Sequence, residues 1–249
     1  MDNKKVIVCD LDGTLAESKS TLSPEMAEVL CKVLHRHFLV IISGGKYSQF
    51  QKQFLSYFSC EPEFLKNLFL FPTNGSTCYI YDTENNNWKQ SYNELLSPEE
   101  REKIIRAFNE TIMELGLNLG KAYGEVVEDR GSQITFSAIG QEAPLEVKKT
   151  WDPDQTKRKE FVHILKNKIP EFEIRIGGMT SIDVTHKGID KAYAIQKIKD
   201  LLKVTDDDIV FVGDALYKGG NDASVKETEV DFIQDSGPDE TLGLLRQYL

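Results

Sequence analysis

The chain has 249 residues, of which 40% are hydrophobic, and its formal net charge is −10. This length allows one or two domains with a large core, and the acidic charge without a basic run excludes a nucleic-acid or anionic-membrane surface. No apolar stretch approaches the length of a membrane span, and we expect no signal peptide because charged Asp10 and Asp12 follow only a short apolar run. The four cysteines lack C-x-x-C spacing, so they predict neither a zinc site nor a disulfide framework, and the expected compartment is the cytoplasm.

The first predicted element is a buried strand, formed by the β-branched run that begins at Val6. It ends at Asp10 and Asp12, two carboxylates spaced i, i+2, and Gly13 then lets the chain turn. In an open α/β sheet, chemistry gathers at the carboxyl ends of the strands. The pair is therefore a candidate catalytic or metal-binding pair, with a solvated Asp-rich turn as the alternative.

A second buried strand over 38–42 runs into Ser43-Gly44-Gly45 and the start of a helix. A hydroxyl at a strand end, with glycine amides opening a helix, can hold a phosphate through hydrogen bonds and the helix dipole. A plain strand-to-helix turn would show the same pattern. The other elements predicted in this half are a helix from Ser23, a strand over 68–72 and a hairpin partner over 77–81.

From Asp82 the sequence becomes polar and Asn-rich, which predicts a domain boundary. The following hundred residues or so group helices with meander strands, a pattern typical of an α+β module. The helices are predicted over 97–116 and 157–169, and the strands over 126–127, 134–137, 172–176 and 181–184. The predicted domains are a core of residues 1–82 and 187–249 and an inserted module of residues 83–186.

The α/β pattern returns with a helix that opens near Lys187 and Lys191, followed by a strand over 209–212. A parallel sheet would bring the polar residues of four separated segments to one edge: Asp10 and Asp12, Ser43, Lys191, and Asp214 with Asn221 and Asp222. Several carboxylates in one place need a hard cation, and oxygen ligands of this kind suit Mg²⁺. One carboxylate could then attack a phosphoryl group, while a second protonates the leaving oxygen and later activates water.

Asp-Leu-Asp-Gly-Thr at 10–14, a strand-end serine, a helix-opening lysine and Gly-Asp…Asn-Asp resemble the four motifs of the haloacid dehalogenase superfamily, in the family's order. The resemblance implies a Rossmann-like α/β core with a parallel sheet and an inserted α+β cap of the large, type IIB kind. It implies that Asp10 is the nucleophile, Asp12 the general acid/base, and Ser43, with Gly44 beside it, a phosphate ligand. It also implies that Lys191 stabilises the phosphate, with Lys187 as a rival. The implied magnesium ligands are Asp10, Asp12 through its carbonyl, Asp214, Asn221 and Asp222.

Within that superfamily, the segments Gly177–Val184, Arg130-Gly131 and Gly219–Asp222 resemble the eukaryotic-type phosphomannomutases. The resemblance implies that Arg130 contacts the phosphate remote from the reacting centre, and that Ser181 and Asp183 contact the sugar. Gln141 and Lys148 are further predicted substrate-binding residues, but they stand where the family has arginines. A guanidinium grips phosphate with a planar fork, which glutamine lacks and lysine replaces only as a point charge.

The expected partner is therefore a small phosphorylated molecule such as a sugar phosphate. A mutase must hold a bisphosphate intermediate by either end, so the weaker cap clamp favours a phosphatase for a hexose phosphate or a similar metabolite. The first alternative is a phosphomannomutase that interconverts mannose 6-phosphate and mannose 1-phosphate. The second is a non-catalytic phosphometabolite-binding module, which the two intact aspartates disfavour. The oligomeric state and the exact substrate stay open.

Overall fold

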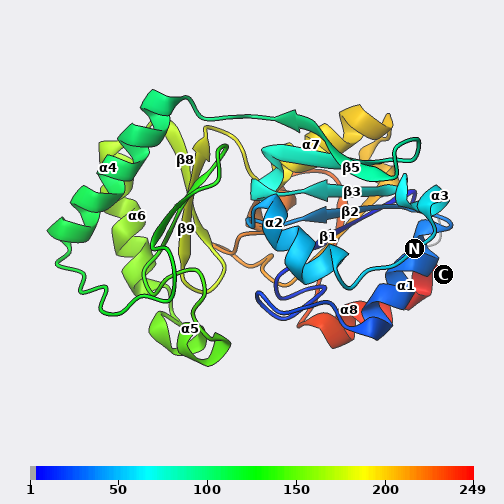
Figure 1. Ribbon diagram of the computed structural model, residues 1–249, viewed down its shortest axis with the longest axis horizontal. Helices are drawn as coiled ribbons and strands as arrows, with labels where there is room; N and C mark the ends of the chain where they lie inside the picture. Colours follow the sequence, from blue (N-terminus) through cyan, green and yellow to red (C-terminus); the bar gives the residue numbers. More distant parts are fainter. Residues whose placement is uncertain (1–3) are drawn as a thin grey trace. The chain divides into compact units, whose positions relative to one another are not determined.

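Residues 4–249, which the computed structural model describes, divide into two units: one runs up to Asn93 and again over Asp190–Leu249, and the other is Glu94–Ile189. The first unit is built on a seven-stranded sheet in the order β11-β10-β1-β2-β3-β4-β5 (Figure 1). Its parallel strands are β1 (Val6–Asp10), β2 (Phe38–Ile42), β3 (Leu68–Phe71), β10 (Ile209–Gly213) and β11 (Asp231–Gln234). An antiparallel hairpin of β4 (Thr77–Asp82) and β5 (Asn87–Asn93) completes one edge. This sheet confirms the predicted α/β core.

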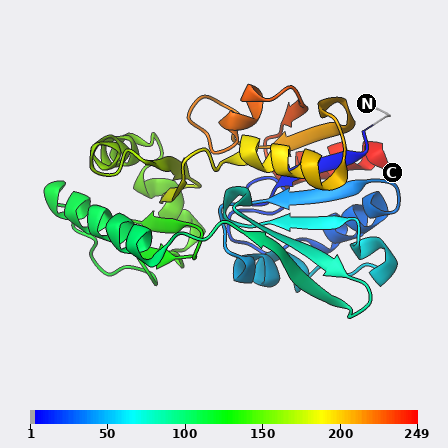
Figure 2. The ribbon, with the colours of Figure 1, turned by 90° about the horizontal axis from the view of Figure 1, so that it is seen from above.

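Helices cover both faces of this sheet, which is why its central strands are continuous apolar runs. The α-helices are α1 (Pro24–Leu34), α2 (Tyr47–Phe50), α3 (Pro62–Leu65), α7 (Lys191–Leu202) and α8 (Pro238–Leu245). A π-helical segment spans Gln51–Leu55, and 3-10 turns span Thr73–Gly75, Asp206–Asp208, Ala223–Glu227 and Arg246–Tyr248. Alternate side chains of β1 pack on opposite faces: Ile7 and Cys9 join the cluster under α1, and Val6 and Val8 join the cluster under α7. Figure 2 shows the ribbon of α7, in yellow, lying along this sheet.

The second unit is a four-stranded antiparallel sheet in the order β6-β7-β9-β8, with α4 and α6 packed against it (Figure 1). The strands are β6 (Val127–Asp129), β7 (Ile134–Ser137), β8 (Phe172–Gly177) and β9 (Ser181–His186), and the helices are α4 (Pro98–Glu114), α5 (Leu145–Trp151) and α6 (Thr156–Lys168). Phe136 of β7 stacks on Phe161 of α6 at a centroid distance of 4.5 Å. The predicted α+β composition of this unit matches the structure, although α5 is absent from the predicted elements.

The domain boundary predicted after Asp82 falls inside the β4–β5 hairpin. β5 pairs with β4 from Asp82↔Asn87 to Thr77↔Asn93, so the first unit continues to Asn93. β5 is an edge strand, and most of its side chains are polar and exposed. It therefore lacks the alternating apolar pattern by which a strand is predicted from sequence. Its composition therefore resembled a linker. The chain returns to the first unit at Asp190 rather than at Lys187.

The prediction that the cysteines form no disulfide is wrong, because Cys31 and Cys60 are joined by one. The two residues are 29 positions apart, and such a spacing carries no recognisable pattern. The fold brings the end of α1 beside the residues that precede α3. Cys9 and Cys78 are buried thiols. Because two of the cysteines form a disulfide, they no longer support a cytoplasmic location, which stays a prediction. Among residues 4–249, no helix is both long and apolar enough to cross a membrane.

Candidate active site

Three carboxylates and one lysine form the centre of the site. Asp10 ends β1, Asp214 follows β10, and Asp222 lies at the end of the loop after β10. Because β1 and β10 are neighbouring parallel strands, carboxylate oxygens of all three residues lie within 4.8 Å of one another. Lys191, the first residue of α7, donates from Nζ to Oδ1 of both Asp10 and Asp222, and its side chain is fully buried. The four residues belong to three segments that are far apart in the chain.

The pKa values of this cluster reflect burial together with the charges of the neighbouring groups. Burial raises the pKa of Asp10 well above its ordinary value, and Lys191 offsets this only in part. Burial, and then the neighbouring Asp222, raise the pKa of Asp214 to about 6. Burial alone would lower the pKa of Lys191, but the charges of Asp10 and Asp222 outweigh it and raise that pKa above its ordinary value. The ammonium therefore stays charged while the carboxylates compete for it.

This donor set fits a bound cation. Three carboxylates share one ammonium, and Oδ2 of Asp10 is buried without a hydrogen-bond partner among the described residues. A buried polar atom without a partner is rare, and it is most simply explained by a ligand that supplies one. Asp10, Asp214 and Asp222 could therefore hold a metal ion. Asn221 lies directly before Asp222 and is half-buried, so its role as a ligand stays a prediction.

Gly13 and Thr14, the last two residues of the motif at 10–14, hold the ends of β1 and β10 together. Gly13 has a φ of +99°, and a Cβ at this position would lie 2.7 Å from Oδ2 of Asp214, so only glycine fits. Thr14 is buried; its Oγ1 accepts a hydrogen bond from the backbone N–H of Asp214 (3.0 Å) and donates one to Oδ2 of Asp235 (3.1 Å). Burial raises the pKa of Asp235 to about 6. The Gly-Thr of the motif therefore positions Asp214.

Asp12 is held by donors from three other segments. Its Oδ1 accepts hydrogen bonds from the backbone N–H of Lys19 (2.5 Å) and from Nε2 of Gln53 (3.2 Å). Its Oδ2 accepts them from Nε2 of Gln49 (3.1 Å) and, at 3.5 Å, from Oγ of Ser43. The Asp12 carboxylate is therefore held by one set of donors, and the Asp10 carboxylate by another.

Ser43 lies directly after β2 and is buried. Its Oγ accepts a hydrogen bond from the backbone N–H of Gly45 (3.0 Å), and Gly44 lies between these two residues. A Cβ at Gly45 would lie 2.6 Å from Oε1 of Gln49, so this turn packs closely on α2. The structure thus brings the predicted phosphate-binding hydroxyl beside Asp12.

Of the two candidate lysines, Lys191 contacts Asp10, and Lys187 belongs to the other unit. Asp190 is the N-cap of α7 and accepts a hydrogen bond from the backbone N–H of Tyr193 (3.0 Å), so that Lys191 opens the helix. Lys187 belongs to the second unit, where its Nζ donates to the backbone carbonyl of Pro170 (3.1 Å). Within the first unit, Lys191 is therefore placed to act on a group bound at Asp10.

The predicted sugar-contacting residues lie on a polar face of the second unit's sheet. Residues of β7 and β9 that alternate with the apolar core residues share this face. Buried Asp183 accepts a hydrogen bond at Oδ1 from Oγ1 of Thr135 (2.8 Å), which in turn accepts one from Nε2 of Gln133. Ser181 pairs with Ser137 across the two strands. The face is therefore a connected polar surface and includes both predicted residues.

Arg130 is paired with a carboxylate inside its own unit. Its guanidinium donates to Oε2 of Glu128 from Nε (2.7 Å) and to Oε1 of Gln141 from Nη2 (3.2 Å). Only 5% of the Arg130 side chain and 9% of the Glu128 side chain are exposed. The structure thus brings Arg130 and Gln141 together. Lys148 lies buried in α5.

Four residues near the predicted groups are missing from the sequence-based list. Gln49 and Gln53 have i, i+4 spacing directly after the Ser43 turn, which places both on one helical face and was a usable signal. Glu128 lies in β6, and Arg130 follows that strand directly, so the sequence gives no shared face for the two residues. Asp235 directly follows β11 at the carboxyl end of that strand. No motif marks any of these four residues.

Comparisons with known proteins agree with this geometry. A family model for eukaryotic phosphomannomutase matches residues 26–248. The phosphomannomutase of Schizosaccharomyces pombe is 29% identical over 252 residues, with 98% of this chain and 94% of that protein covered. The phosphomannomutase of Saccharomyces cerevisiae is 30% identical over 251 residues, with 97% and 93% covered.

Solved structures show the fold. A haloacid dehalogenase-like hydrolase from Bacteroides thetaiotaomicron aligns with a TM-score of 0.63 at 17% identity, over 99% of this chain and 100% of that one. A truncated IMP-nucleotidase of Plasmodium falciparum aligns with a TM-score of 0.74 at 17% identity, over 99% of this chain and 70% of that one. The chain belongs to the eukaryotic phosphomannomutase family of enzymes, and its fold is that of the haloacid dehalogenase-like hydrolase.

Proposed function

We propose that the chain is a magnesium-dependent phosphatase that hydrolyses a hexose phosphate or a similar small metabolite through an aspartyl-phosphate. The observation that favours hydrolysis over isomerisation is the charge balance around Arg130. Its charge is matched by buried Glu128, and its neighbour is the neutral amide of Gln141. A phosphate at this position would meet a guanidinium that is already neutralised instead of an arginine cluster.

In the first step, the carboxylate of Asp10 attacks phosphorus while Asp12 gives its proton to the leaving alcohol oxygen. In the second step, Asp12 takes a proton from a water molecule as the water oxygen attacks the same phosphorus, and inorganic phosphate leaves with Asp10 restored. Lys191 fixes the Asp10 carboxylate and offsets charge on the phosphoryl oxygens, and Ser43 offers them its hydroxyl. Gln49 and Gln53 orient Asp12.

The residues proposed to hold magnesium are Asp10, Asp214 and Asp222, together with Asn221 and the carbonyl of Asp12. When bound, Mg²⁺ would offset the negative charge of these carboxylates and of the substrate phosphate. A site made of oxygen donors alone suits Mg²⁺ better than it suits zinc or copper.

Phosphomannomutase activity is the second candidate, and the full-length similarity to two yeast phosphomannomutases favours it. The polar face with Ser181 and Asp183 would serve a hexose phosphate in either reaction. A mutase must pass the phosphoryl group from Asp10 to a hexose phosphate rather than to water, and it must then rebind the bisphosphate intermediate in the opposite orientation. That demand makes the cap's grip on the remote phosphate the feature that separates the two activities.

One experiment separates the candidates. The purified chain with Mg²⁺ is given a panel of hexose phosphates, and released inorganic phosphate is measured. In parallel, mannose 1-phosphate with a hexose bisphosphate activator is assayed for mannose 6-phosphate. We expect phosphate release to exceed isomerisation. Isomerisation faster than release would overturn the proposal in favour of the mutase, and neither activity in a folded chain would favour the binding module.

A further inference from the structure

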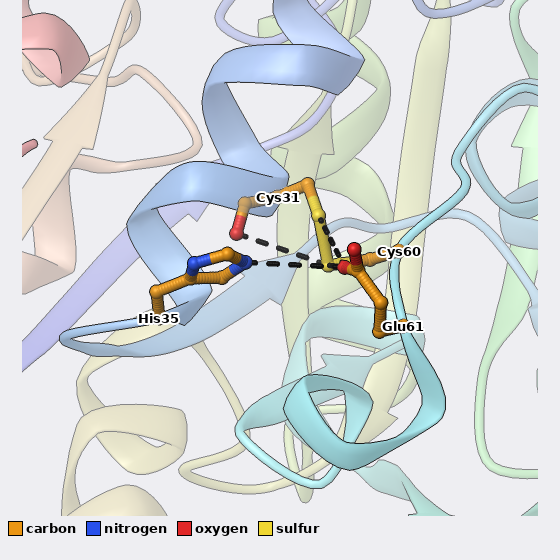
Figure 3. Close-up of side chains that lie close together, drawn as sticks. All are labelled: Cys31, His35, Cys60 and Glu61. Atoms are coloured by element: carbon orange, nitrogen blue, oxygen red, sulfur yellow. Dashed lines mark hydrogen bonds and ion pairs between the residues drawn. A yellow bond between two sulfur atoms is a disulfide. The ribbon is translucent and has the colours of Figure 1, made fainter.

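A second set of metal-ligating side chains lies in the first unit, at the end of α1. Cys31 and His35 are spaced i, i+4, so they share one face of the helix end, and Cys60 and Glu61 directly precede α3. Figure 3 shows the four side chains converging on one point. One ligand atom from each of the four lies within 4.8 Å of all the others. None of them has a part in the proposed phosphoryl transfer.

The carboxylate of Glu61 stands at the centre of this set. Its Oε2 is 3.7 Å from Sγ of Cys31, 3.6 Å from Sγ of Cys60 and 3.9 Å from Nε2 of His35. The imidazole of His35 stacks on Phe64 at a centroid distance of 3.8 Å, which orients the ring. Two sulfurs, one imidazole nitrogen and one carboxylate oxygen form a donor set that tetrahedral zinc accepts and that magnesium does not.

The set is also accessible from solvent. Cys31, His35 and Glu61 line a surface hollow together with Glu28 and Tyr57. The side chains of His35 and Glu61 are 44% and 63% exposed, so an ion has an entry path. The two cysteines are half-buried beneath them. A site of this kind can load and release its metal without unfolding of the core.

We propose that the reduced chain binds Zn²⁺ through Cys31, His35, Cys60 and Glu61, and that the disulfide between the two cysteines closes this site. Thiolates bind zinc strongly, whereas the uncharged sulfurs of a disulfide do not. A dithiol reductant breaks the S–S bond by giving two electrons and two protons, and it becomes a disulfide itself. Zinc then displaces both thiol protons into solvent. The reverse exchange with a disulfide oxidant re-forms the Cys31–Cys60 bond and releases the ion.

The test uses Co²⁺ as a spectroscopic probe on the full chain, with excess Mg²⁺ present to occupy the carboxylate cluster at Asp10. The chain is reduced with a phosphine under anaerobic conditions and titrated. We expect one equivalent of Co²⁺ to produce a thiolate-to-cobalt charge-transfer band, and one equivalent of Zn²⁺ to remove it. The oxidised chain should give no such band. A reduced chain without the band, or an oxidised chain with an equal one, would overturn the proposal.

Two variants keep the test independent of the disulfide. Glu61→Gln removes one ligand and leaves both cysteines, so the reduced variant should bind Co²⁺ at least about tenfold more weakly. Glu63→Gln, at an exposed carboxylate two residues away, is the matched control and should bind like the wild type. Equal affinities for the two variants would count against the site. Hydrolysis of phosphate esters should be the same in both, since the proposed reaction uses neither residue.

Discussion

Lys191 in the first unit and Arg130 in the second are both buried cations beside carboxylates, but their charge balances differ. Lys191 stands between Asp10 and Asp222, with Asp214 also in the cluster. Arg130 pairs with a buried carboxylate, Glu128, and with a neutral amide, Gln141. The first cluster therefore has more negative charge than its lysine can offset, whereas the second is close to neutral.

The two clusters therefore differ in how each would respond to an incoming charged group. An excess of buried negative charge raises carboxylate pKa values and is tolerable because a cation can join the cluster. A neutral buried pair is already satisfied, so it offers little to an incoming phosphate. The comparison teaches that a cation could join the cluster at Asp10, whereas the charge of Arg130 in the second unit is already matched by Glu128.

The largest effect is expected from Asp10→Asn. The amide cannot attack phosphorus, so kcat for phosphate release should fall by about 10⁴-fold or more. The fold should survive, because the change removes one carboxylate from a cluster that has too many. Steady-state kinetics with Mg²⁺ and thermal unfolding measure the two effects, and Asp207→Asn, at an exposed carboxylate, is the control. An active Asp10→Asn variant would remove Asp10 from the role of nucleophile.

Lys191→Gln tests the ammonium of the core cluster. Without this cation, charge on the phosphoryl oxygens is less well offset, and kcat should fall by about 10²–10³-fold. Lys187→Gln is the matched control, because Lys187 contacts Pro170 instead and should leave kcat unchanged. The two variants are compared under saturating Mg²⁺. A larger loss in Lys187→Gln than in Lys191→Gln would reverse the assignment of the lysine.

Glu128→Gln tests the neutral pair of the cap. The change leaves the buried Arg130 guanidinium without the Glu128 carboxylate, and the free energy of unfolding should fall by about 3 kcal/mol. Chemical denaturation of Glu128→Gln is compared with that of Glu125→Gln, at an exposed carboxylate three residues earlier. Equal stabilities would mean that Arg130 is satisfied without Glu128, and the two clusters would then differ less in their charge balance.

Gln141→Arg adds a second guanidinium beside Arg130. If the weak clamp is what favours hydrolysis, the ratio of isomerisation to phosphate release should rise about tenfold, the gain expected from one charge-assisted bidentate contact. Gln141→Lys adds the charge without the planar fork and should give a smaller rise. The coupled assay with mannose 1-phosphate measures both products. A ratio that both variants leave unchanged would remove the clamp as the cause.

The core cluster could be predicted from sequence because its residues follow buried strands, and a parallel sheet brings strand ends together by its topology. Asp10, Ser43 and Asp214 are examples of this rule. The residues that hold them could not be found in this way, because Gln49 and Gln53 reach Asp12, and Thr14 reaches Asp235, through side-chain contacts across the fold. Such contacts depend on where helices pack, which periodicity does not specify.

Three further features, one in the second unit and two in the first, are not predicted from the sequence for a related reason. The charge of Arg130 is matched because the Glu128 side chain turns toward it. A spacing of two residues in the sequence does not reveal such an ion pair. The disulfide depends on the approach of α1 to the segment before α3. The edge strand β5 was missed because hydrogen bonds to β4, rather than apolar side chains, hold it in the sheet.

The smallest effect is expected from Asp235→Asn, and it concerns pH. Burial raises the folded-state pKa of Asp235 from 3.8 to about 6. Between these values the folded chain binds the proton that the unfolded chain has lost, so the free energy of unfolding falls as pH rises from about 4 to 6. The amide of the Asp235→Asn variant does not titrate, so this part of the fall should disappear, on the order of 1 kcal/mol across the window.

Asp214 titrates in both the wild type and the variant, so the pH dependence of stability that it contributes is common to the two curves. Denaturation in EDTA at several pH values, with Asp239→Asn as an exposed control, measures the difference. Parallel curves for the wild type and Asp235→Asn would show that burial does not raise the pKa of Asp235 in the folded chain.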